Sequence, residues 1–182
     1  MKKMYVNLSF APRHMRTEAL NHKYVYGTQI QGGRLVQDLA DMHQKCTQSY
    51  VRRPYGVGLL VASHDQTGPH LYSTEPSGDY YEYVAMAIGS RSQTSRTYLE
   101  SNFNLFAASS LEDLIKHALK ALSSSLSADS ELDVKSASVA VVGQGTPFEI
   151  IEGQALQKYL DEIEVEAGNA IIADIVLENI DA

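Results

Sequence analysis

The order of its helical and hairpin-like segments constrains this chain most. Apolar residues recur at three- to four-residue spacing on both sides of a block of β-type sequence, and a second hairpin follows the second helical pair. The pattern predicts two helices, three strands, two helices, two strands and a last helix. Hairpins grouped between paired helices indicate an α+β layered fold, because alternating βαβ units would put a helix between consecutive strands.

The first part of the chain is predicted to hold a short strand and two helices. Residues Tyr5–Phe10 alternate between apolar and small polar types, which favours a half-buried strand. Pro12 then suits the first turn of a helix that ends at Gly27. A second helix is predicted over Gln31–Cys46, and its apolar stripe needs another element to cover it.

Three strands are predicted next. The apolar run Tyr55–Ala62 indicates a buried strand, Asp65–Pro69 a turn, and His70–Thr74 the returning strand of a β-hairpin. A third strand is predicted over Tyr80–Ile88.

Two helices follow this block. One is predicted to open near Ser90, and the other runs from Ser110 to Leu126 with leucines on one face. Ser109 and Glu112 have the spacing of a capping box.

The remaining sequence predicts a hairpin and a last helix. The strands are Ser136–Val142 and Phe148–Ile151, and the helix is Gln154–Ile163. The 182 residues favour one domain, which we place at residues 1–165, with a tail at 166–182.

Composition excludes several function classes. A net charge of −7, with no Lys/Arg cluster beyond Arg52-Arg53, predicts that nucleic acid is not a partner. Cys46 is the single cysteine, so neither an intrachain disulfide nor a Cys-based zinc site is expected. The sequence lacks an apolar run of membrane-spanning length, so we expect no membrane partner.

Candidate catalytic residues are few, and for each a non-catalytic interpretation is favoured. Ser63-His64-Asp65 contains the residue types of a triad, but neighbours on an extended chain point to opposite faces. Thr28 follows a glycine, as a processed N-terminal nucleophile would, but the sequence after it does not continue into a strand. Gly56-Val57-Gly58 lacks the third glycine of a dinucleotide motif and is expected to allow close backbone packing.

Candidate binding residues are equally weak. No histidines lie four residues apart on a helix with a third ligand nearby, so we expect no metal and no cofactor site. The acidic run Asp161–Glu166 is either a docking tail or a solvated face, and three tyrosines are either interface residues or ordinary strand residues. The histidines are His14, His22, His43, His64, His70 and His117, and the tyrosines are Tyr80, Tyr81 and Tyr83.

Several ordered motifs resemble the α-type subunits of the 20S proteasome, and the block formed by residues 87–93 and 96–100 resembles the type-1 group in particular. The resemblance covers residues 15–163. The motifs are Gln48-Ser49-Tyr50, Arg53-Pro54-Tyr55-Gly56-Val57-Gly58-Leu59-Leu60, Gly68-Pro69-His70-Leu71, Ala87-Ile88-Gly89-Ser90-Arg91-Ser92-Gln93, Arg96-Thr97-Tyr98-Leu99-Glu100, Ser138-Val139-Ala140-Val141-Val142-Gly143 and Phe148-Glu149-Ile150-Ile151.

This resemblance implies a four-layer αββα sandwich of the N-terminal-nucleophile hydrolase type. It implies a non-catalytic structural subunit of a hetero-oligomeric ring, with other α subunits, β-ring subunits and regulatory caps as partners. The α ring of that family restricts substrate entry in ubiquitin-dependent protein degradation in the cytoplasm and nucleus. We expect the helix near Ser90 and the helix Gln31–Cys46 to contact neighbouring subunits.

The sequence departs from the family at both ends. The family's N-terminal helix and first strands have no counterpart, so we expect an incomplete sandwich that is poorly soluble or partly molten by itself. The gate and the cap-binding lysine therefore cannot be placed on any residue. Near the C-terminus, Ala170–Leu177 is apolar where such tails are generally polar.

Two alternatives stay open. Beside the structural subunit, these are an active N-terminal-nucleophile peptidase of β or bacterial type and a non-assembling fragment from an incomplete gene model. The peptidase requires a free Thr, Ser or Cys at the mature N-terminus, which Met1-Lys2-Lys3 does not supply.

Overall fold

The computed structural model describes residues 2–126, 132–163 and 165. The contact pattern divides the chain into two units, Met1–Ile88 with Val142–Gly145 and Gly89–Val141 with Thr146–Ala182. Both units contain helices and strands, which confirms the α+β prediction. Within the described ranges, no helix has both the length and the apolarity needed to cross a membrane.

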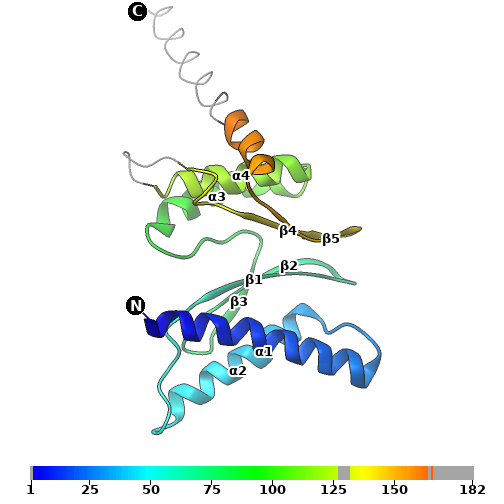
Figure 1. Cartoon of the computed structure of the whole chain (residues 1–182), viewed down its shortest axis with the longest axis vertical. Coiled ribbons are helices and arrows are strands. Elements are labelled where there is room, and N and C mark those ends of the chain that lie inside the picture. Colours follow the sequence, from blue (N-terminus) through cyan, green and yellow to red (C-terminus); the bar gives the residue numbers. More distant parts are fainter. Residues whose placement is uncertain (1, 127–131, 164, 166–182) are drawn as a thin grey trace, which may run out of the picture. The chain divides into compact units, whose positions relative to one another are not determined.

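The first unit contains a three-stranded antiparallel sheet with the strand order β1-β2-β3 (Figure 1). The strands are β1 (Leu59–Asp65), β2 (Gly68–Thr74) and β3 (Tyr80–Tyr83). Asp65 pairs with Gly68, so only Gln66 and Thr67 form the turn between β1 and β2. The predicted hairpin is confirmed, with a shorter turn than expected.

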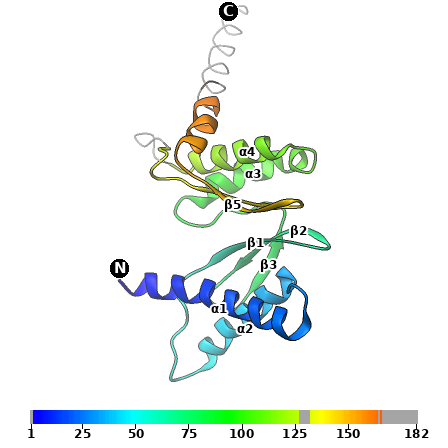
Figure 2. The same cartoon turned by 45° about the vertical axis from the view of Figure 1, so that its right-hand side comes forward.

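Two helices lie side by side on one face of this sheet, as both views show (Figures 1 and 2). They are α1 (Lys2–Tyr26) and α2 (Gly32–Gln48). The predicted helix Gln31–Cys46 is therefore confirmed within two residues at its C-terminal end. Its apolar stripe is buried against the sheet, and the buried residues of α2 are Gly32, Val36, Leu39, Ala40, His43 and Cys46.

The predicted strand Tyr5–Phe10 is wrong, because those residues belong to α1. Pro12 lies inside that helix rather than in its first turn. An alternation over six residues is too short to fix the period, and the helix is already packed at Ala11, which is only 1% exposed. Gly27 does end the helix: its φ is +70° and its N–H donates to the carbonyl of Lys23 at 2.9 Å.

The first and third strands are shorter than predicted at one end. Residues 55–58 precede β1, because the Tyr55 ring packs on the buried His43 ring, with a centroid separation of 4.5 Å, instead of joining the sheet. β3 ends at Tyr83, so residues 84–88 do not extend the strand. In the observed register Pro69 would stand near Ala85, and proline has no N–H for the ladder.

The second unit pairs helices with a two-stranded sheet (Figure 2). Its elements are α3 (Ser92–Phe106), α4 (Leu111–Ser123), the first three residues of β4 (Val139–Gly143), β5 (Thr146–Ile151) and a helix over residues 154–163. This order agrees with the prediction. The core of the unit is formed by α4, the last helix and one face of β4 and β5, with Ile115, Leu119, Leu156 and Leu160 buried at its centre.

The predicted capping box of α4 is displaced by one residue. Ser110, not Ser109, is the N-cap, and its hydroxyl accepts a hydrogen bond from the Asp113 N–H at 3.2 Å. The same hydroxyl donates to Asp113 Oδ2 at 2.7 Å. The Ser109 hydroxyl does not cap α4, because it donates a hydrogen bond to the carbonyl of Leu105 at the end of α3. Two adjacent serines made the sequence ambiguous, and their backbone conformation decides which one caps the helix.

The apolar stripe of α4 is covered only in part, since Ile115 and Leu119 are buried but its two ends are not. Leu39 of α2 is fully buried, whereas Leu111 and Leu122 of α4 remain 49% and 45% exposed. The predicted tail at 166–182, with Ala170–Leu177, lies outside the described residues.

Candidate functional site

A cluster of polar side chains joins the three strands of the first unit at one end of the sheet. We call it the His70 cluster, and it consists of Asp65, Thr67, His70 and Glu82. His70 lies on the central strand, with Nδ1 2.5 Å from Glu82 Oε1 and Nε2 3.2 Å from Asp65 Oδ1. One imidazole therefore bridges carboxylates from the two flanking strands.

Both carboxylates shift the protonation equilibria of the cluster. The hydrogen bond with Glu82, assisted by the charge of Asp65, raises the pKa of His70 above its ordinary value. Hydrogen bonds from the hydroxyl and the N–H of Thr67, with a smaller effect of His70, lower the pKa of Asp65 to about 2. The His70 and Asp65 side chains are 19% and 15% exposed, so solvent screens this ion pair only in part.

The cluster resembles a hydroxyl–imidazole–carboxylate triad in composition but not in proton arrangement. Thr67 Oγ1 lies 2.7 Å from His70 Nε2 and donates its proton to Asp65 Oδ1 at 2.5 Å. A general base must accept the hydroxyl proton, whereas the proton of the Thr67 hydroxyl goes to the Asp65 carboxylate and not to His70. The arrangement is therefore an ion-pair network that ties the strands together, and it does not activate Thr67 as a nucleophile.

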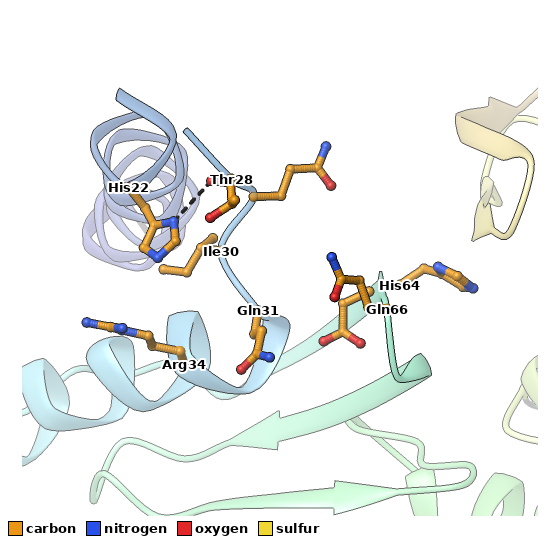
Figure 3. Close-up of a pocket in the computed structure, with 9 residues that line it drawn as sticks. His22, Thr28, Ile30, Gln31, Arg34, His64 and Gln66 are labelled. Carbon is orange, nitrogen blue, oxygen red and sulfur yellow. Dashed lines mark hydrogen bonds between the residues drawn. The ribbon is translucent and has the colours of Figure 1, made fainter. Parts of the chain in front are cut away.

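A pocket of about 690 Å³ lies beside this cluster (Figure 3). The end of α1, the linker to α2, the first turn of α2 and the β1–β2 turn form its walls. Its lining is polar except for one isoleucine and consists of His22, Thr28, Gln29, Ile30, Gln31, Arg34, His64, Asp65 and Gln66.

The pocket does not concentrate one charge. Figure 3 shows His64 directed away from the side on which Arg34 and His22 lie. His22 is hydrogen-bonded to the linker, since its Nδ1 lies 3.1 Å from the carbonyl oxygen of Thr28. Asp65 takes part in the His70 cluster. These walls offer mixed hydrogen-bond donors and acceptors without a convergent set of charged groups.

The structure does not bring Ser63, His64 and Asp65 together as a triad. Ser63 Oγ is buried without a hydrogen-bond partner and lies against Gly32, under α2. His64 is the next residue of β1 and so points to the opposite face of the sheet. Asp65 instead bonds with Thr67 and His70.

Thr28 lies in the linker between α1 and α2 rather than at a chain end in this structure. Its carbonyl oxygen is bonded to His22, and the residue lines the pocket. No strand begins within the described linker residues, so Thr28 lacks the strand position that the sequence argument required.

The close-packing interpretation of the two glycines holds for one of them. A Cβ at Gly58 would lie 3.2 Å from the carbonyl oxygen of Thr74, so this glycine allows the two backbones to approach closely. A Cβ at Gly56 would meet no atom within 4 Å.

The histidines take separate structural positions. His43 is fully buried in α2, with Nδ1 3.1 Å from the carbonyl oxygen of Glu75. His117 of α4 bonds with the Tyr98 hydroxyl at 3.0 Å and packs edge-on against Phe106. Among the described residues, no three His, Cys, Asp or Glu side chains are grouped in a way that could hold a metal ion.

The remaining surface candidates are exposed or paired within the chain. Tyr80 and Tyr81 of β3 are 39% and 58% exposed. In the acidic run, Asp161 accepts a hydrogen bond from Gln157, and Glu162 forms an ion pair with Lys116 at 2.9 Å. Residues 164 and 166 of that run lie outside the described residues.

Comparison with known proteins identifies the family. The family profile described as proteasome subunit matches residues 9–142, which is most of the chain. The chain belongs to the proteasome subunit family.

Similar members of the proteasome family are named as α-type subunits. The chain is 50% identical over 154 residues to "Proteasome subunit alpha type-1" of Dictyostelium discoideum, covering 84% of this chain and 62% of that protein. It is 44% identical to the Trypanosoma brucei rhodesiense protein of the same name, covering 82% and 56%. The Drosophila melanogaster protein is 42% identical, covering 81% and 54%. The chain thus spans somewhat more than half the length of these relatives.

Sequence reasoning missed the His70 cluster of this proteasome-family chain. In the sequence His70 is a candidate only as one of six histidines that could bind a metal, and neither Thr67 nor Glu82 is a candidate. The signal available was the two-residue turn, which sets the register and brings Asp65, Thr67 and His70 to one end of the hairpin. The contribution of Glu82 also requires the register of β3, which no short motif specifies.

Proposed function

We propose that this chain is a non-catalytic structural subunit of the α ring of the 20S proteasome core. The observation that carries the proposal is the 42–50% identity to proteins named proteasome subunit alpha type-1, together with the family profile over residues 9–142. The proposed partners are other α subunits, β-ring subunits and regulatory caps, in the cytoplasm and nucleus. The proposed role is ring assembly, control of substrate access and regulator docking in ubiquitin-dependent degradation.

The absence of a catalytic role is part of this proposal. The threonine-protease activity would belong to other subunits of the complex. Two observations support this assignment within the described residues. His64 points to the face of β1 opposite Ser63 and Asp65, and the Thr67 hydroxyl donates its proton to a carboxylate. Neither arrangement supplies a nucleophile with an adjacent base.

We also propose that residues 1–165 form one partial proteasome α-subunit-like domain, an incomplete four-layer αββα sandwich of the N-terminal-nucleophile hydrolase type. Support comes from the second face of each sheet. On β4 and β5, Val142, Phe148 and Ile150 are 36%, 66% and 53% exposed. On β1 and β2, Leu60 and Leu71 occupy the face opposite the side chain of Ser63, which lies against α2. Apolar sheet faces need cover, which a layered sandwich of this type would provide.

Co-assembly tests the proposed function. An epitope-tagged copy of the chain is expressed in cells that contain proteasomes, and lysates are separated by native sedimentation. We expect the tagged chain to co-sediment with α and β subunits at the mass of the core particle. The same tag on an unrelated protein of similar size is the control. A tagged chain found only at its monomer mass, beside intact particles, would contradict the proposal.

N-terminal sequencing of the purified chain separates the α-type assignment from an active peptidase. An intact Met1, or its simple removal, is expected for a non-catalytic subunit. A mature chain that begins with Thr28, or with another Thr, Ser or Cys, would favour the peptidase.

A further inference from the structure

One exposed stripe of α1 is basic, in a chain that is acidic as a whole. We call it the basic stripe, and it consists of Arg13, Arg16, Leu20, Lys23 and Tyr24. The first four follow one another at spacings of three and four, and Tyr24 lies four residues after Leu20, which places all five on one face of the helix. All five are exposed, and Leu20 and Tyr24 have exposed fractions of 68% and 92%.

The opposite side of the same helix packs within the first unit. Ala11 is buried, and Met15, Glu18 and His22 are half-buried, again at spacings of three and four. The helix α1 contacts α2. The two faces of α1 are therefore distinct, and the basic stripe is the one without cover in this unit.

The helix α1 is basic, whereas the chain as a whole is acidic. Lys2–Tyr26 contains five Lys or Arg and a single acidic residue, whereas the chain carries a net charge of −7. Within the described ranges, Arg13, Arg16 and Lys23 make no ion pair. Three cations thus flank two exposed apolar side chains, and no carboxylate among the described residues compensates them.

We propose that the basic stripe is a docking surface for an acidic patch with an apolar centre on a neighbouring protein subunit. This inference rests on the proposed function, because an α-ring subunit works only within an assembly. An apolar centre surrounded by charged groups is the usual anatomy of a protein interface, and Arg and Tyr are enriched there. Carboxylates on the partner would complement the stripe and fix its register.

The same features argue against the other polyanions that bind basic helices. Because α1 carries an excess of basic residues, the other residues together have a net charge more negative than that of the whole chain. They would therefore repel phosphate backbones and anionic lipid surfaces. A membrane-surface helix also needs a large apolar face, whereas Leu20 and Tyr24 are the only large apolar members of this stripe.

Neutralising the stripe tests the inference in the co-assembly experiment. The variant R13Q/R16Q/K23Q removes the three charges without adding carboxylates. We expect it to enter core particles about tenfold less than the wild type in direct competition, with the difference smaller at high salt. The matched control is R52Q/R53Q, which removes two exposed arginines outside α1 and should assemble like the wild type.

The outcomes distinguish this inference from the proposed function. If the wild type assembles and the neutralised variant assembles equally well, the docking surface is wrong and the proposed function stands. If the wild type stays outside intact particles, both are wrong. Stripe-dependent self-association of the purified chain, or stripe-dependent binding to phosphatidylserine vesicles, would also overturn the inference.

A second variant guards against misfolding. Thermal unfolding of R13Q/R16Q/K23Q should match that of the wild type, because the three side chains are exposed. If this variant unfolds at a lower temperature than the wild type, L20S/Y24S is used in the same competition for core particles. It keeps the charges and removes the apolar centre. Assembly of folded L20S/Y24S at wild-type levels would overturn the inference.

Discussion

Ser63 of β1 lies directly beneath Gly32, the first residue of α2, so that a Cβ built on Gly32 would stand 2.0 Å from Ser63 Oγ. The absence of a side chain at Gly32 therefore sets how closely the helix approaches the sheet. The close fit leaves Ser63 Oγ buried without a hydrogen-bond partner.

The first prediction concerns this contact. Gly32→Ala should lower the free energy of unfolding by about 1–3 kcal/mol, because the added methyl group forces apart a packed helix and strand. Ser63→Gly in the same chain should recover part of the loss, which a double-mutant cycle measures by denaturant unfolding. Gly56→Ala is the control, since a Cβ there meets no atom within 4 Å. Equal effects of the two alanines would refute the close-approach argument.

The second prediction concerns the pH dependence of the His70 cluster. The raised pKa of His70 adds stability that is fully present below about pH 6.5 and is lost as the pH rises through the folded-state value. The pKa of Asp65, lowered to about 2, adds stability above about pH 4 that is lost on acidification. The contribution of the cluster to the free energy of unfolding should therefore be largest between about pH 4 and about pH 6.5.

Unfolding of the wild type and of His70→Gln, compared across pH, checks this prediction. The difference between the two should narrow above neutral pH and again below about pH 4. His14→Gln serves as the control for loss of a histidine outside the cluster. A stability difference that does not vary with pH would mean that His70 does not titrate with its carboxylate partners.

Local patterns in the sequence were sufficient for most elements of the fold. The leucine stripe of α4 and the glycine-containing turns are local signals, and the predicted element order agrees with the structure. The errors lie where distant residues decide. Tyr55 leaves the strand because His43, from a separate helix, packs against its ring. Residues 5–10 are helical although their alternation is that of a strand.

The candidate site was harder to predict for the same reason. The His70 cluster combines one residue from each of three strands and one from a turn, so it exists only once two registers are set. Consecutive residues such as Ser63-His64-Asp65 attract notice in a sequence, yet alternation along β1 separates them.

The third prediction concerns the N-cap of α4. Ser110→Ala should lower the free energy of unfolding by about 1 kcal/mol, because the Asp113 N–H loses its hydrogen-bond acceptor. The pKa of Asp113, which the Ser110 hydroxyl holds below its ordinary value, should rise toward that value, as NMR titration would show. Ser109→Ala is the matched control one residue earlier. A larger loss of stability from Ser109→Ala than from Ser110→Ala would restore the capping box expected from the sequence.

The fourth prediction concerns the core of the second unit. Leu156 is fully buried among Ile115, Leu119 and Leu160, so Leu156→Ala should lower the free energy of unfolding by about 2–5 kcal/mol. The matched control is Leu105→Ala, since Leu105 is a helical leucine that is 54% exposed. Denaturant unfolding of both variants measures the difference. The last helix would not be part of the core if the two substitutions cost the same, because removing an exposed side chain leaves no cavity.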